Sequence, residues 1–82
     1  MAGPLKRSIT IAGHATSVTL EPVFWKALEE AADESALPLN ALVARIDAAR
    51  TQSDETVNLA SAIRCWLFER LRSQLYGAST SA

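Results

Sequence analysis

The chain has 82 residues, of which 49% are hydrophobic, and its formal net charge is −1. A chain of this length forms one small domain, which buries a modest share of its surface and usually needs a staple or a partner. The only cysteine, Cys65, excludes an internal disulfide, and with the only histidine, His14, it matches no common zinc spacing. We therefore expect no metal site and no cofactor, and a second chain as the source of stability.

No apolar run approaches the roughly 18–20 residues needed to span a bilayer, and no signal-like segment opens the chain. We therefore expect a cytoplasmic protein with no membrane contact. Charge is unevenly spread: residues 1–20 contain Lys6 and Arg7 and no acid, whereas residues 21–34 contain five acids and one lysine. Only the N-terminal end of the molecule is therefore suited to meet DNA.

The composition divides the chain into an arm, one domain and a tail. We expect residues 1–7 to form a flexible N-terminal arm and residues 77–82 a flexible tail, with a single domain over residues 8–76. The domain should be mainly α with a short β-ribbon: one or two strands over about 8–20 and helices over about 22–34, 38–51 and 59–76.

The strand segment alternates in a way that one regular strand cannot accommodate. Ile9 and Ile11 occupy odd positions, whereas Val18 and Leu20 occupy even ones. A strand of period two keeps both pairs on one face only if the register is reset between them. Gly13 marks the place for that reset, and both one bulged strand and two short strands remain open.

A lone short strand leaves its backbone hydrogen-bonding groups unsatisfied. Pairing with the same strand of a second chain would satisfy them and would make the protein a homodimer. The resulting two-stranded ribbon is one of the few β structures that enter the major groove of DNA.

The first two predicted helices each have a proline in the first turn, Pro22 and Pro38, where the missing N–H is tolerated. Each helix also carries one apolar stripe with charged residues opposite. The stripes include Trp25, Leu28, Leu42 and Ile46.

The third predicted helix is apolar around most of its circumference, through Ala62, Ile63, Cys65, Trp66, Leu67, Phe68 and Leu71. Asn58 is its predicted N-cap and Gly77 its predicted C-terminal glycine. A helix that is apolar on most sides must be buried on more than one side. One short chain offers too little material for that burial, which is a second argument for a dimer. We expect both Trp66 and Cys65 to be core residues.

Together these elements resemble the ribbon-helix-helix superfamily. The resemblance rests on a strand ending Val18-Thr19-Leu20-Glu21-Pro22, a helix with Trp25-x-x-Leu28-x-x-x-Ala32, and a helix with Leu39-Asn40-x-Leu42-Val43. One bacterial subfamily is similar in more detail, over Gly13-His14-Ala15-Thr16-Ser17-x-x-Leu20-Glu21-x-x-Phe24-Trp25, Leu42-Val43-x-x-Ile46-Asp47 and Asn58-Leu59-Ala60-Ser61-Ala62-Ile63-Arg64. The resemblance covers about residues 6–72.

The resemblance implies a homodimer in which one strand of each chain pairs antiparallel with its copy. Outward strand residues would read bases in the major groove, and the start of the second helix would hold a phosphate. The residues expected to contact DNA are Lys6, Arg7, Ser17, Thr19 and Asn40, with Ala15 also facing outward. The expected dimer core comprises Val18, Leu20, Trp25, Leu28, Leu42, Ile46 and Trp66. The leading prediction is a small DNA-binding transcriptional regulator.

Three features depart from the usual DNA-reading pattern. The outward strand residues are small and neutral, Glu21 follows them directly, and Pro38 supplies neither a hydroxyl nor an N–H at the start of the second helix. The alternative prediction is therefore a protein-interaction or antitoxin-like module that has kept the fold and lost DNA binding. Such a module would present the acidic first helix or the third helix to a protein partner.

One further polar cluster is predicted, a small pocket lined by His14, Thr16 and Arg64. The chain has no nucleophile elbow, no phosphate-cradling glycine loop and no paired catalytic side chains, so we expect no enzyme activity.

Overall fold

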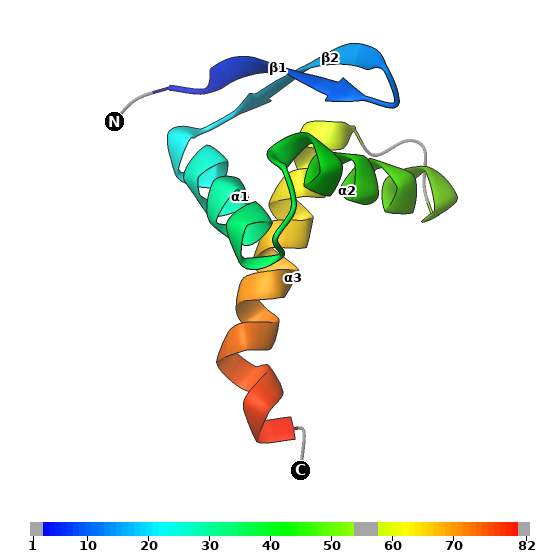
Figure 1. Ribbon diagram of the computed structural model, residues 1–82. Helices are drawn as coiled ribbons and strands as arrows, with labels where there is room; N and C mark the ends of the chain where they lie inside the picture. The colour runs from blue at the N-terminus through cyan, green and yellow to red at the C-terminus, as the bar shows by residue number, and fades with distance from the viewer. Residues whose placement is uncertain (1–2, 54–57, 81–82) are drawn as a thin grey trace.

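The computed structural model describes residues 3–53 and 58–80, in which a two-stranded sheet precedes three helices. The elements are β1 (Leu5–Ile11), β2 (His14–Leu20), α1 (Pro22–Glu34), α2 (Leu39–Ser53) and α3 (Leu59–Thr80). The ribbon of β1 and β2 lies across one end of the molecule, and α3 runs from near the ribbon to the opposite end (Figure 1). The predicted fold class, mainly helical with a short β-ribbon, is confirmed.

The ribbon is an antiparallel hairpin within one chain, so the segment forms two short strands rather than one bulged strand. Ala12 and Gly13 form its turn, with φ angles of 51° and 82°. Two consecutive positive φ angles suit the right-handed twist of tightly connected strands. The hairpin begins at Leu5, so residues 5–7, predicted as flexible arm, are strand residues because they pair with the end of β2.

The hairpin register explains how residues of opposite parity share one face. Across the two-residue turn, odd-numbered residues of β1 stand opposite even-numbered residues of β2, as in the pairs Leu5–Leu20 and Ile9–Thr16. Ile9, Val18 and Leu20 consequently all face the helices, where 5%, 3% and 0% of their surfaces are exposed. The intervening residues of both strands face solvent.

A hydrogen bond ties the start of the ribbon to α1. The indole Nε1 of Trp25 donates to the carbonyl oxygen of Leu5 at 2.9 Å, while the rest of the indole lies in the core. The polar atom of this large buried side chain is therefore satisfied, as buried indoles require.

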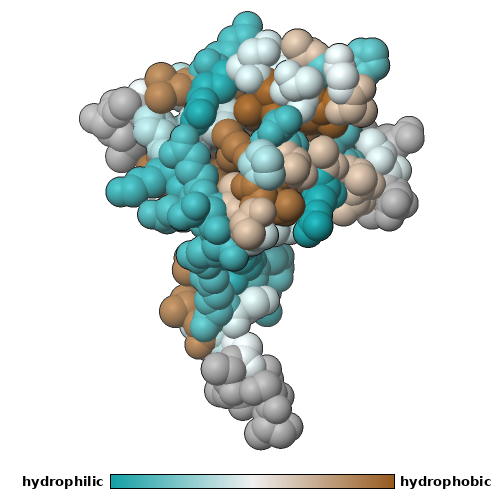
Figure 2. Space-filling view, in the orientation of Figure 1, coloured by the Kyte–Doolittle hydropathy of each residue, from teal (hydrophilic) through white to brown (hydrophobic). Residues whose placement is uncertain are grey.

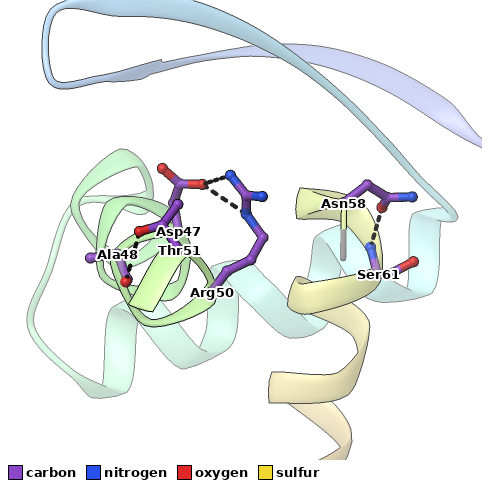
Figure 3. Close-up of polar contacts among 6 residues, drawn as sticks. All are labelled: Asp47, Ala48, Arg50, Thr51, Asn58 and Ser61. Carbon is purple, nitrogen blue, oxygen red and sulfur yellow. Dashed lines mark hydrogen bonds and ion pairs between the residues drawn. The ribbon is translucent and has the colours of Figure 1, made fainter. Parts of the chain in front are cut away.

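Asn58 caps α3 as predicted. Its Oδ1 accepts a hydrogen bond from the N–H of Ser61 at 2.8 Å, as Figure 3 shows. The same view shows the side chain of Asp47 bound to Arg50 near the end of α2. Residues 54–57, between α2 and α3, lie outside the described residues.

The last two helices extend past their predicted ends. α2 ends at residue 53 rather than 51, and α3 continues to residue 80 rather than stopping at 76. Gly77 was predicted to end α3, but it lacks the positive φ of a C-terminal glycine. A single glycine inside a helix costs only about 1 kcal/mol, which the helix tolerates here. Residues 77–80 of the predicted tail are therefore helical, and residues 81–82 lie outside the described part.

The core lies between the inner face of the ribbon and the three helices. Six of the seven predicted core residues are at most 4% exposed: Val18, Leu20, Trp25, Leu28, Leu42 and Ile46. The seventh, Trp66, is only partly buried against this core. Cys65 is exposed, so its predicted place in the core is wrong for the single chain. In the described part of α3 only Ile63 and Leu67 are buried, because the body of the chain covers one side of that helix.

Candidate nucleic-acid interface

Six side chains form the solvent-facing side of the hairpin, which we call the outer ribbon face. They are Lys6, Ser8, Thr10, Ala15, Ser17 and Thr19, and all six are exposed. Lys6 stands opposite Thr19, and Ser8 stands opposite Ser17. The structure thus brings three of the predicted DNA-contacting residues, Lys6, Ser17 and Thr19, onto one surface that carries hydroxyl groups, one positive charge and no acid.

Ser8 and Thr10 join this face although the sequence pattern alone did not single them out. Their orientation depends on β1 pairing with β2, which the choice between one strand and two had left open. The signal was the Ala12-Gly13 dipeptide: a two-residue turn there sets Ser8 opposite Ser17. With that register, both strands contribute alternate residues to the same face.

Arg7 does not belong to the outer ribbon face, although it was predicted to contact phosphate. Its strand position faces α1, where its Nη1 lies 3.0 Å from an Oε2 of Glu29. Its guanidinium also lies 4.5 Å from the centroid of the Trp25 ring. The alternation of a strand sends neighbouring residues to opposite faces, so Lys6 and Arg7 cannot both face outward.

Arg64 serves as a clamp between α3 and the β2–α1 junction. Its Nη2 lies 2.9 Å from Oε1 of Glu21, its Nε donates to the same oxygen at 3.0 Å, and its guanidinium lies 5.7 Å from the Phe24 ring centroid. The pKa of Glu21 is lowered, first by a backbone hydrogen bond to its carboxylate and then by Arg64. The acid that follows the ribbon is therefore neutralised within the chain.

The predicted polar pocket is not formed around Arg64. His14 is exposed at the turn end of β2, whereas Glu21, which binds Arg64, follows the other end of that strand. Seven residues of extended chain span roughly 23 Å, so the structure keeps the Arg64 head group away from His14. Thr16 is partly buried on the inner side of the ribbon, opposite Ile9.

Asn40 is exposed in the first turn of α2, on a different element from the ribbon. The carbonyl oxygen of Pro38 accepts hydrogen bonds from the N–H groups of Ala41 and Leu42 at 3.1 and 3.2 Å. Pro38 thus opens the helix without offering a side-chain donor to an anion. A phosphate contact by Asn40 stays a prediction.

The acidic surface of α1 is partly neutralised by arginines of other elements. Glu29 binds Arg7, and Glu34 binds Arg70 of α3. Glu30 and Asp33 are exposed beside them. Internal ion pairs thus reduce the negative field that a basic protein partner would meet there.

The described residues contain neither a cluster of metal-ligating side chains nor a helix that could cross a membrane. Within residues 3–53 and 58–80, no three side chains of His, Cys, Asp or Glu come together as a metal site would require. None of the helices, over the same residues, has the length and hydropathy needed to cross a bilayer.

A profile of the ribbon-helix-helix domain family matches residues 4–71, which include both strands, α1, α2 and the first half of α3. The chain belongs to the ribbon-helix-helix domain family. Proteins of this family are generally DNA-binding transcription regulators or antitoxins, and the fold is not an enzyme fold. No curated protein and no solved structure matches the chain significantly. The narrower resemblance to one bacterial subfamily stays a prediction.

Proposed function

We propose that this ribbon-helix-helix protein is a homodimeric DNA-binding transcriptional regulator that reads the major groove with its outer ribbon face. The observation that carries the proposal is the composition of that face. It presents four hydroxyl groups and one lysine from two paired strands, and the major groove admits two neighbouring strands side by side. Hydroxyl side chains can donate to or accept from any base edge in that groove.

The arrangement of internal ion pairs supports this reading. Glu21, which follows the ribbon directly, is bound by Arg64, so its repulsion of phosphate is reduced. Glu29 of α1 is bound by Arg7 of β1. Lys6 pairs with no acid among residues 3–53 and 58–80, so the ribbon end of each copy keeps this charge as its contribution to phosphate binding.

In the proposed dimer, β1 and β2 would make different contacts with DNA. In the described chain, β2 has β1 along one edge and no strand along the other, where β2 of a second copy would add. Neighbouring strands lie about 4.8 Å apart, so the two β1 strands of such a four-stranded sheet would be about 14 Å apart, wider than the roughly 12 Å major groove. Ser17 and Thr19 on β2 would therefore meet base edges, and Lys6 on β1 would meet the phosphates at the groove wall.

Selection of genomic DNA fragments on the purified protein tests the proposal. The wild-type protein should enrich a motif with two-fold symmetry, and Lys6→Ala/Thr19→Ala should lose it. Lys26→Ala is the matched control, since it removes the same charge from an exposed position on α1. No enrichment by a folded wild-type dimer, or equal loss in the control, would contradict the proposal.

The second candidate is a protein-interaction or antitoxin-like module, which the apolar exposed surface of α3 favours. Salt separates the two functions, because DNA affinity falls as salt rises, in proportion to the number of phosphates contacted. A protein-binding module would show little DNA affinity even at low salt. Charge reversal at Glu30 and Asp33 would then weaken binding to its protein partner.

A further inference from the structure

The distal half of α3 exposes a continuous apolar seam. Phe68, Leu71 and Leu75, which we call the α3 seam, are 61%, 52% and 66% exposed. In Figure 2, apolar side chains lie along one flank of the helix that protrudes from the body. Large contiguous apolar surfaces on soluble proteins mark interaction sites, so something covers this seam in the working protein.

The seam has the spacing of a coiled coil. Its residues are three and four positions apart, as the a and d positions of a heptad are, with Phe68 and Leu75 at a and Leu71 at d. Beside the seam, Val23 and Phe24 of α1 help to line an open groove of about 300 Å³ that Phe68 and Leu71 also border. A helix packed along the α3 seam would therefore also contact apolar side chains of α1, at the end of the seam nearest the ribbon.

We propose that the α3 seam pairs with the seam of a second copy of this chain, with the two α3 helices parallel. Charges beside the seam favour this direction. In a parallel pair, Arg72 at position e lies beside the preceding g position of the second copy, which is the uncharged and largely buried Leu67, so it meets no like charge. In an antiparallel pair centred on the seam, Arg72 of one copy faces Arg72 of the other, and like charges disfavour that arrangement.

The shape of the molecule supports the same direction. The ribbon lies at one end and the C-terminal end of α3 at the other (Figure 1). Parallel helices therefore place both ribbons at the same end of the dimer, as the proposed pairing of β2 with its copy requires. An antiparallel pair would place them at opposite ends.

The α3 seam is too small to form a stable dimer interface by itself. A stable interface buries about 800 Å² per partner, more than three half-exposed side chains supply. The seam thus complements the contact along β2, and it rests on the homodimer of the proposed function but not on DNA binding.

Analytical ultracentrifugation tests the seam without DNA. Leu75→Asp should weaken dimerisation roughly a hundredfold, since two leucines per dimer lose their apolar burial. Ser73→Asp is the matched control: it adds the same charge at an exposed position on the opposite side of α3 and should leave the dimer intact. Circular dichroism checks that both variants remain helical. If the two variants dimerise with equal affinity, the α3 seam does not stabilise the dimer, and this proposal alone is overturned. If the wild type is monomeric, the homodimer of the proposed function is overturned as well.

Distances between spin labels test the direction. The wild type carries one exposed cysteine, Cys65, and a Cys65→Ser/Ser73→Cys variant moves the label eight residues along α3. In a parallel pair both label-to-label distances should be short. In an antiparallel pair, moving the label by eight residues at about 1.5 Å per residue shifts the labels of the two copies in opposite directions, by about 24 Å in total. The axial label-to-label distances of the two experiments would then add up to at least about 24 Å. Such a pattern would overturn the parallel arrangement.

Discussion

Lys6 and Arg7 are neighbours with the same charge, and the structure predicts opposite consequences for their removal. Lys6 lies on the outer ribbon face, whereas Arg7 faces α1 and binds Glu29 at 3.0 Å. Each phosphate contact adds about 0.9 to the slope of log K against log salt on B-DNA. Because a dimer presents two Lys6 side chains, Lys6→Ala should lower that slope by about 1.8. Arg7→Ala should leave it nearly unchanged.

Fluorescence anisotropy on a fragment recovered by the selection measures this difference. When salt rises fourfold, from about 50 to 200 mM, a difference of about 1.8 in slope changes the ratio of the wild-type affinity to the Lys6→Ala affinity about twelvefold. Arg7→Ala also removes an exposed ion pair and a ring contact, each of which stabilises the fold by about 1 kcal/mol or less, so thermal unfolding must confirm that the variant is folded. An equal loss of slope in both variants would mean that Arg7 leaves Glu29 on DNA, and would refute the assignment of faces.

Three further predictions concern the fold. Leu28→Ala should lower the free energy of unfolding by about 2–5 kcal/mol in urea titrations, because Leu28 is fully buried; a change as small as that of a surface substitution would contradict its place in the core. Ala12→Gly should raise that free energy by up to about 1 kcal/mol, because Ala12 has a φ of 51°; a lower thermal midpoint would contradict the turn. The lowered pKa of Glu21 favours its charged form in the folded state, so its contribution is present above the unfolded pKa and is lost as pH falls through the lowered folded value. Glu21→Gln should therefore flatten the acid side of the stability profile, and Arg64→Gln should flatten it in part; unchanged profiles would show that this ion pair does not stabilise the fold.

The helices could be predicted from periodicity because their buried residues recur along one stripe. Trp25, Leu28, Leu42 and Ile46 were all assigned to the core from spacing alone, and all four are buried in it. The ribbon was harder, since the parity of its apolar residues changes between Ile9 and Val18. Only the two-residue turn, with two positive φ angles, decides that both residues share the inner face.

The partners of charged side chains could not be predicted, because they depend on how the elements pack. Arg7 and Glu29 are 22 positions apart, and Arg64 and Glu21 are 43 positions apart. Neither pair has a sequence signature. Both change the predicted site: Arg7 is held on the inner side of the ribbon instead of the outer ribbon face, and the carboxylate of Glu21 beside the ribbon is paired with Arg64.

These pairs also set how strongly the ribbon can be attracted to DNA. On the outer ribbon face of each copy the charge comes from Lys6 alone, so a dimer brings two cations to the duplex. Proteins with six to ten phosphate contacts derive much of their affinity from counterion release, and two lysines supply a small part of that. Affinity must then come from hydrogen bonds and fit within the groove, where Ser17 and Thr19 would lie on the strand nearest the axis of the proposed dimer. Binding should accordingly depend weakly on salt and strongly on base sequence. Substitution of Thr19 should therefore relax sequence preference while leaving the salt slope unchanged, the reverse of the effect of Lys6→Ala.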